Sequence, residues 1–114
     1  FARIINSAAD LFVIPSVREA FGQTCLEAFC CGTPAVGFRQ AGGITDMIEN
    51  GITGYLANDM NAQSLAAEME KIITMAKGDY LTMSANCRQM AVNEYALKIQ
   101  AGRYNEIYKN LLAK

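Results

Sequence analysis

The chain of 114 residues contains no histidine and no tryptophan. The lack of histidine excludes imidazole zinc sites and catalysis by a histidine acid or base within these residues. No D-x-D pair occurs, and the aspartates are scattered along the chain, so we expect neither a divalent metal held by carboxylates nor any other cofactor. Ten basic and eleven acidic residues form no run of one sign, which argues against nucleic-acid binding.

Long apolar runs are absent as well. The longest falls far short of the roughly 20 residues that span a bilayer, and no basic-then-apolar leader opens the chain. The cysteines follow neither a C-x-x-C nor a metal-finger spacing. We therefore expect reduced core thiols in a cytoplasmic protein, or in a longer one at the cytosolic face of a membrane. The four cysteines are Cys25, Cys30, Cys31 and Cys87.

The stretch from residue 15 to residue 34 carries most of the candidate chemistry. The apolar run before it, residues 11–14, is typical of a strand buried on both faces of a parallel sheet. After a loop, apolar residues recur at helical spacing over residues 25–30, and Gly32 and Pro34 then end the pattern. The sequence therefore predicts a strand, a loop and a helix in succession.

The start of this predicted helix is a candidate binding site. In an open parallel sheet, loops after the carboxyl ends of strands form the ligand crevice, and a helix N-terminus there favours an anion. Glu19 and Glu27 flank that N-terminus, eight residues apart, and carboxylates accept hydrogen bonds from hydroxyl groups. A nucleotide sugar, with phosphates at its centre and hydroxyls at both ends, fits this arrangement.

A structural interpretation of the same residues is also open at this point. Thr24 and Glu27 have the T-x-x-E spacing of a capping box, in which Glu27 would reach back to the Thr24 backbone N–H and bind no ligand. Ser16 and Glu19 have the same spacing. The spacing alone does not separate a capping role from a binding role.

Two further short strands are predicted over residues 34–38 and 53–57, with a short helix over residues 44–49 between them. Two strand-helix-strand connections within about fifty residues imply parallel pairing with right-handed crossovers. We therefore expect an α/β fold, a partial doubly wound parallel sheet of about three strands flanked by helices. Gly42 and Gly43 should lie at the same edge as the Glu19 loop, either lining the crevice or making a tight turn.

The sequence predicts one domain, residues 1–114. Its core spans residues 8–57, and a helical tail follows over residues 61–114. One helix is predicted to run to about Lys77 and to end at Gly78, with Asp79 capping the next helix, on which Leu81 belongs to the apolar stripe. Apolar positions recur on the last helix without an evident cover. We therefore expect a homodimer or a domain swap through residues 97–114.

Several landmarks in register resemble the donor-binding half of a family 4 retaining glycosyltransferase of the GT-B fold. They are E-x7-E from Glu19 to Glu27 with an enclosed F-G, then C-G-T-P over residues 31–34, G-G at residues 42–43 and N-G-x-T-G over residues 50–54. The resemblance covers residues 8–57 strongly, and residues 61–112 only as a helical tail. It implies that the chain is the carboxyl-terminal half of a GT-B Rossmann-like domain and a fragment of a longer enzyme.

The resemblance also implies an activity, which is transfer of a sugar from a nucleotide-diphospho-sugar donor to an acceptor with retention, of the hexosyltransferase type. Glu27 is similar to the family's glutamate that binds the ribose hydroxyls. Glu19 is similar to the one that faces the donor sugar, and is the expected catalytic residue, as nucleophile or as positioning group. The other expected donor-binding residues are Ala20, Phe21, Gly22, Gln23, Thr24, Gly42 and Gly43.

Departures from the family pattern limit these expectations. An arginine and a lysine that usually neutralise the pyrophosphate upstream of the motif have no counterpart, and Asp46 stands where glutamate is usual. We therefore expect the fragment to be inactive without the missing N-terminal acceptor domain. The alternatives are a nucleotide-sugar epimerase of the same fold, which would need an acid and a base from elsewhere, and a non-catalytic α/β interaction module.

Overall fold

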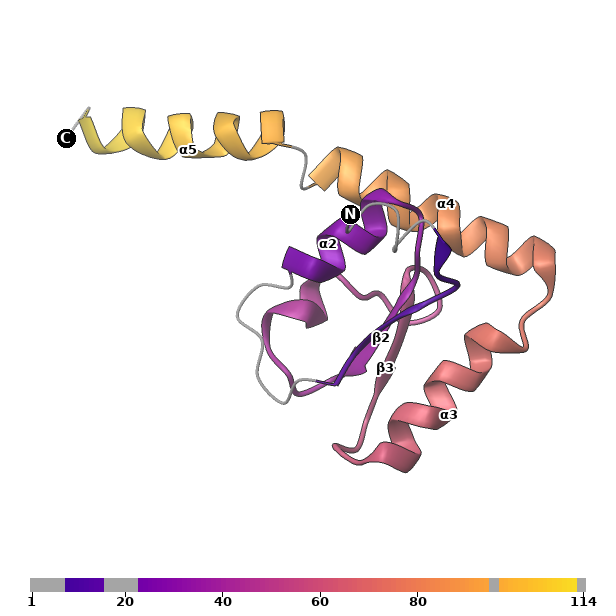
Figure 1. Ribbon diagram of the computed structural model, residues 1–114. Coiled ribbons are helices and arrows are strands. Elements are labelled where there is room, and N and C mark those ends of the chain that lie inside the picture. Colours follow the sequence, from indigo (N-terminus) through magenta and orange to yellow (C-terminus); the bar gives the residue numbers. More distant parts are fainter. Residues whose placement is uncertain (1–7, 16–22, 95–96, 113–114) are drawn as a thin grey trace.

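A computed structural model describes residues 8–15, 23–94 and 97–112 of the chain (Figure 1). Its three short strands, β1 (Phe12–Ile14), β2 (Ala35–Phe38) and β3 (Gly54–Ala57), form a parallel sheet in the order β1-β2-β3. Because the strands are parallel and neighbouring in sequence order, all three carboxyl ends lie at one edge and all three amino ends at the other. The expected α/β fold with a three-stranded parallel sheet is confirmed.

Two short helical connections join the strands. Helix α2 (Gln23–Cys30) joins β1 to β2, and its end is closed by N–H groups of Gly32 and Thr33, which donate to the carbonyls of Phe29 and Ala28 at 2.9 Å each. This is the glycine-terminated helix end that the sequence predicts. The connection from β2 to β3 contains the single 3-10 turn η1 (Gly43–Asp46).

The helix predicted over residues 44–49 is therefore shorter than expected. The buried Thr53 hydroxyl donates to the carbonyl of Met47 at 3.0 Å and accepts from the N–H of Glu49 at 2.9 Å. These backbone groups are the ones that a continuing helix would use. The side-chain hydrogen bonds of Thr53 thus replace the second turn and direct the chain into β3.

The core lies against both faces of the sheet. Figure 1 shows the sheet between α2 on one side and α3 (Ala62–Ile73) on the other. Phe29 of α2 is fully buried, and burial of a side chain of this size stabilises the fold by roughly 1.5–3 kcal/mol. Leu65 and Ile72 bury one face of α3. Three apolar residues in and just after η1 are buried as well: Ile44, Met47 and Ile48.

Helix α3 ends earlier than the sequence predicts. Its last residue is Ile73, and the Thr74 hydroxyl and backbone N–H both bond to the carbonyl of Glu70. Ile73 is 66% exposed because only one face of α3 meets the sheet. Gly78 and Asp79 lie in the first turn of α4 (Lys77–Glu94), so the predicted helix end and helix cap at these two residues are wrong.

The inward face of α4 also differs from the prediction. Leu81, expected on the apolar stripe, is 57% exposed. The observed stripe consists of positions three, four and four residues apart, which recur on one side of a helix, and Leu81 lies about 100° away from it. Its members are the partly buried Tyr80 and the buried Met83, Cys87 and Ala91.

Helix α5 (Leu97–Leu112) extends away from the rest of the molecule (Figure 1). The whole molecule measures 53 × 28 × 26 Å. The apolar side chains of α5 from residue 104 onward are exposed, and Leu112 reaches 87%. The uncovered apolar face that the sequence indicates is therefore present, and self-association through it stays a prediction. The exposed apolar residues are Tyr104, Ile107, Tyr108, Leu111 and Leu112.

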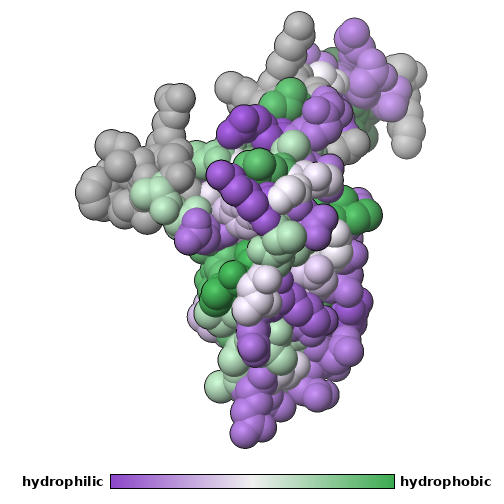
Figure 2. Space-filling model, turned by 90° about the vertical axis from the view of Figure 1, so that its right-hand side faces the viewer, coloured by the Kyte–Doolittle hydropathy of each residue, from purple (hydrophilic) through white to green (hydrophobic). Residues whose placement is uncertain are grey.

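The side of the molecule formed by α3 and α4 intersperses polar and apolar residues (Figure 2). Ile73, Leu81 and Val92 contribute exposed apolar side chains on these helices. Within the residues described, no helix is both long enough and apolar enough to cross a membrane.

Candidate functional site

The carboxyl edge of the sheet gathers exposed polar residues and the start of α2. β1 ends at Ile14, β2 at Phe38 and β3 at Ala57, and exposed residues follow the last two strands directly. α2 begins at Gln23, so its N-terminus faces the edge at which β1 ends. The first N–H groups of a helix have no partner within the helix and lie at the positive end of its dipole. α3 also begins at this edge, where the Asn61 side chain accepts from the N–H of Ser64 at 2.7 Å. Both helix dipoles make this edge favourable for an anion.

The two faces of α2 have different environments. Cys25, Ala28 and Phe29 are buried, whereas Thr24 and Glu27 are exposed. Thr24 lies inside α2 rather than before it, and no hydrogen bond joins it to Glu27 among the described residues, so the capping box does not form there. The Glu27 carboxylate, one turn into the helix, accepts no hydrogen bond from any described residue.

The structure describes only part of the predicted site. Glu19, Ala20, Phe21 and Gly22 lie outside the described residues, and Gln23 is placed only by its backbone at the start of α2. The structure therefore brings the helix start to the expected edge of the sheet, without placing the expected catalytic residue.

Gly42 and Gly43 lie at the same edge, after β2. Gly42 precedes η1 with φ of 101°, a backbone conformation that strains any residue with a side chain. Its carbonyl accepts from the Thr45 hydroxyl at 2.8 Å. The tight turn that was one interpretation of these glycines is thus present, and Gly42 is also exposed, which leaves its backbone open to a ligand.

Sequence reasoning missed a pair of residues at this edge. Arg39 follows the last residue of β2, and its Nε donates to Oδ1 of Asn58, which follows the last residue of β3, at 2.7 Å. Phe38 pairs with Ala57 in the sheet, so the register places the two side chains next to each other. The sequence signal that could have revealed this pair is the position of Arg39 and Asn58 directly after two predicted strands that are neighbours in the sheet.

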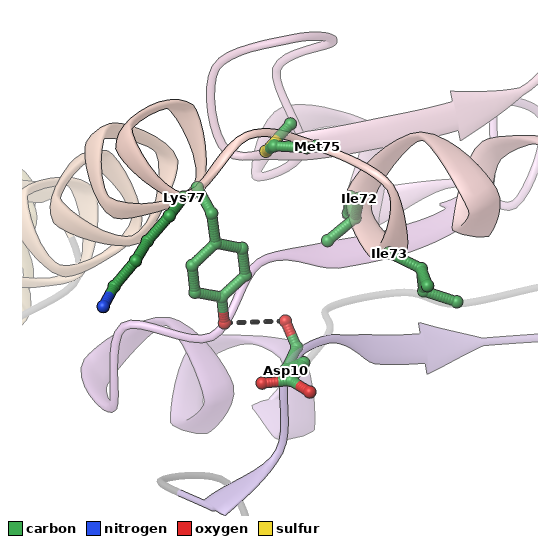
Figure 3. A pocket seen from close by; sticks show the side chains of 6 residues that line it. Asp10, Ile72, Ile73, Met75 and Lys77 are labelled. Carbon is green, nitrogen blue, oxygen red and sulfur yellow. Dashed lines mark hydrogen bonds between the residues drawn. The ribbon is translucent and has the colours of Figure 1, made fainter.

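The amino edge of the sheet is occupied by α4. Its side chains donate hydrogen bonds to carbonyl groups that precede each strand: Tyr80 to Asp10 at 2.7 Å, Ser84 to Gly32 at 2.6 Å, Asn86 to Ile52 at 3.1 Å and Cys87 to Thr53 at 3.2 Å. A cavity of about 250 Å³ at this edge has apolar walls from Ile72, Ile73 and Met75. Figure 3 shows its single drawn hydrogen bond, from Tyr80 to the backbone of Asp10. Asp10 and Lys77 also line the cavity and form no ion pair among the described residues.

Burial governs the titrating groups at the amino edge. Burial and then the nearby Cys25 raise the pKa of the Cys87 thiol to about 12. Burial, followed by Asp10 and Cys87, raises the pKa of Tyr80. Burial, followed by Cys31 and Glu27, raises the pKa of Cys30, which is exposed rather than in the core as expected. Raised thiol pKa values keep these cysteines protonated and weakly nucleophilic near neutral pH.

A metal site is not evident in the described part of the chain, where no three His, Cys, Asp or Glu side chains group closely enough to hold an ion. All four cysteines are free thiols. The candidate site is therefore the carboxyl edge, where two helix N-termini and polar side chains favour an anion.

Comparison with known proteins identifies the family. Residues 3–91 match the family described as Glycosyl transferases group 1. This chain belongs to the group 1 glycosyl transferase family. One relative is an N-acetyl-alpha-D-glucosaminyl L-malate synthase from Bacillus anthracis, 31% identical over 106 residues, which covers 91% of this chain and 27% of that protein.

Solved structures share the fold of this chain. A sucrose-phosphate synthase from Thermosynechococcus elongatus superposes with a TM-score of 0.86 at 28% identity, covering 96% of this chain and 27% of that one. Anabaena HepE in complex with UDP superposes with a TM-score of 0.84 at 26% identity, covering 93% and 29%. These neighbours are GT-B glycosyltransferases. The chain thus spans between a quarter and a third of the proteins that it resembles.

Proposed function

We propose that this chain forms the donor-binding part of a family 4 retaining glycosyltransferase that transfers a sugar from a nucleotide-diphospho-sugar to an acceptor. The observation that carries the proposal is the carboxyl edge, where the α2 N-terminus lies with the Glu27 carboxylate, which accepts no hydrogen bond from a described residue. The family match supports it, as does HepE, a fold neighbour with UDP bound. In this proposal residues 1–114 are one domain, with a core over 8–57 and a helical tail over 61–114.

Each proposed donor contact follows from the chemistry of its residue. The first N–H groups of α2, at Gln23 and Thr24, face the diphosphate, because they have no partner within the helix and lie at the positive end of its dipole. Glu27 accepts hydrogen bonds from two ribose hydroxyls, which suits a carboxylate with two acceptor oxygens. The backbone at Gly42 and Gly43 contacts the sugar, where the absence of a side chain permits close approach.

The proposed reaction needs no base from the described residues. The acceptor hydroxyl attacks the anomeric carbon on the face from which the nucleoside diphosphate leaves, and the departing phosphate oxygen takes the hydroxyl proton. The helix dipole of α2 stabilises the negative charge that develops on the leaving group. Glu19, with the backbone of Ala20, Phe21 and Gly22, would face the donor sugar in this proposal, as nucleophile or as positioning group.

The acceptor would be bound by a further domain that is not part of this chain, and the isolated chain would then be inactive. The exposed apolar face of α5 is consistent with such an arrangement, because an uncovered stripe of this kind packs against another surface. In the isolated chain the same face, residues 97–114, is the expected contact of a homodimer or a domain swap.

The test is nucleotide binding by the full-length protein. Calorimetric titration with UDP, GDP and ADP should show one of them binding, and Glu27→Gln should weaken it by about 1.5–3 kcal/mol, the usual weight of a hydrogen bond to a charged group. Glu70→Gln, an exposed glutamate on α3, is the matched control and should leave the affinity unchanged. Equal affinities for wild type and Glu27→Gln would remove Glu27 from the site.

The retaining outcome has its own measurement. NMR of the product formed from a nucleotide sugar of known anomeric configuration should show the same configuration at the new bond. An inverted configuration would contradict the assignment to a retaining family, although nucleotide binding would still support a donor site.

A further inference from the structure

We propose that Arg39, held by Asn58, binds a phosphate group of a substrate at the carboxyl edge of the sheet. The phosphate belongs either to the diphosphate of the donor or to a phosphorylated acceptor. This inference rests on the proposed function, since it adds a cationic side chain to the same site. Arginine suits phosphate because its planar guanidinium presents several N–H donors in a fixed fork.

The position of Arg39 is determined by the sheet. Its backbone N–H donates to the carbonyl of Ala57 at 2.9 Å, which continues the pairing of β2 with β3 to the last residue before the loops. The side chain therefore starts at the carboxyl edge and cannot reach the amino edge. It shares this edge with Gly42 and with the N-termini of α2 and α3.

The hydrogen bond to Asn58 orients the guanidinium without neutralising its charge. Nε of Arg39 donates to the amide oxygen of Asn58 at 2.7 Å, and an amide is uncharged. Among the described residues, Arg39 joins no ion pair, and the nearby Asp59 does not pair with it. The ion pair that the described residues do contain joins Lys71 and Glu68, both on α3, at 2.8 Å. Lys71 is thus compensated by a carboxylate. No described carboxylate compensates Arg39, and apart from the bond to Asn58 its guanidinium N–H donors have no partner among the described residues.

Two substitutions separate binding from a purely structural link between the loops. Arg39→Gln removes the charge but keeps an N–H donor that can reach Asn58, so a link alone would survive. Arg39→Lys keeps the charge without the fork. Lys77→Gln is the control, because it removes an exposed positive charge at the opposite edge of the sheet.

The first arm measures the affinity of the full-length protein for the nucleoside diphosphate that wild type prefers and for the matching nucleoside. If the phosphate belongs to the donor, Arg39→Gln weakens binding of the nucleoside diphosphate about 10- to 100-fold. The substitution leaves the affinity for the nucleoside unchanged and lowers the salt dependence of diphosphate binding. Arg39→Lys retains most of the affinity, and Lys77→Gln behaves as wild type.

The second arm measures binding of inorganic phosphate to protein saturated with the same nucleoside diphosphate. If the phosphate belongs to the acceptor, wild type binds it under these conditions, and Arg39→Gln weakens it by a similar factor. Loss in either arm supports the proposal and identifies the source of the phosphate. Unchanged affinities in both arms overturn it. If wild type binds none of UDP, GDP and ADP, the proposed function fails, independently of Arg39.

Asn58 is a positioning residue in this proposal, and a double-mutant cycle tests it. Asn58→Ala should weaken phosphate binding less than Arg39→Gln, because the charge remains but its orientation is lost. In the double variant the Asn58 substitution should add nothing, since it acts only through Arg39. Additive losses would show that Asn58 acts independently and would overturn this part.

Discussion

The two edges of the small parallel sheet differ in how the rest of the chain uses them. At the amino edge, four side chains of α4 donate hydrogen bonds to carbonyl groups that precede β1, β2 and β3. At the carboxyl edge, exposed side chains and two helix N-termini face outward. At the amino edge the polar groups bond to other groups of the chain, whereas at the carboxyl edge exposed polar groups are available to a ligand.

The family landmarks divide between the same two edges. Residues 31–34 and 50–54 lie in the turns that precede β2 and β3, and there the Asn50 side chain accepts from the N–H of Leu56 at 2.9 Å. Gly42, Gly43 and the start of α2 lie at the other edge. A motif that resembles a family therefore mixes residues that shape the sheet with residues that are candidates for the donor, and only the fold separates them.

The largest effect should come from Gly54, at the start of β3. A Cβ at this position would run into the backbone carbonyl oxygen of Ala35 in the neighbouring strand. Because backbone cannot move aside without breaking the sheet, Gly54→Ala should lower the free energy of unfolding by more than about 4 kcal/mol or prevent folding.

Gly78→Ala is the matched control for Gly54→Ala. A Cβ on Gly78 meets no atom within 4 Å in the first turn of α4, and alanine favours a helix over glycine by about 1 kcal/mol. Chemical denaturation of both variants measures the difference. A Gly54→Ala protein as stable as Gly78→Ala would show that the β2–β3 contact is looser than described.

A Thr→Val pair compares the two edges directly. Thr53, buried before β3, donates to Met47 and accepts from Glu49. Thr53→Val therefore leaves one buried and one part-buried backbone group without this partner and should cost about 2–4 kcal/mol. Thr45, at the carboxyl edge, bonds only to the carbonyl of the exposed Gly42. Because water can replace that bond, Thr45→Val should cost at most about 1.5 kcal/mol. Equal losses in thermal unfolding would contradict the difference between the edges.

The amino edge should also lose stability in alkali. Burial raises the pKa of Cys87 to about 12 from an ordinary value of 9.0. The unfolded chain therefore releases this proton near pH 9 while the folded chain keeps it. The stabilisation is complete below pH 9 and is lost as the pH rises toward 12, with a slope of about 1.4 kcal/mol per pH unit. Cys87→Ala should lack this slope. Curves that stay parallel to pH 11 would show that Cys87 is not the titrating group.

The sheet could be predicted from the sequence because its strands are short apolar runs bounded by glycine and proline, and two successive crossovers leave one parallel order. The helix boundaries near Gly78 could not, because glycine is tolerated in the first turn of a helix and α3 ends through a local bond of Thr74. Apolar spacing also misplaced Leu81, since several stripes on α4 are similarly apolar, and only docking on the sheet selects one.

The candidate site was predictable to a similar extent. The start of α2 and Gly42 were expected at the carboxyl edge from the order of strand, loop and helix, and both are there. The bond between Arg39 and Asn58, 19 residues apart, depends on the register that sets Phe38 opposite Ala57. Such a register is fixed by packing of both strands and is not visible in either segment alone.

The smallest expected effect concerns Tyr80, and it tests whether the two edges act independently. Tyr80→Phe removes only the hydroxyl that donates to the carbonyl of Asp10, so it should lower the free energy of unfolding by about 0.5–1.5 kcal/mol. Nucleotide affinity should not change, because β1 separates Asp10 from the carboxyl edge. Calorimetric titration beside thermal unfolding measures both. A loss of affinity in Tyr80→Phe would mean that α4 positions the binding edge through the strands, and the division between a structural and a binding edge would no longer hold.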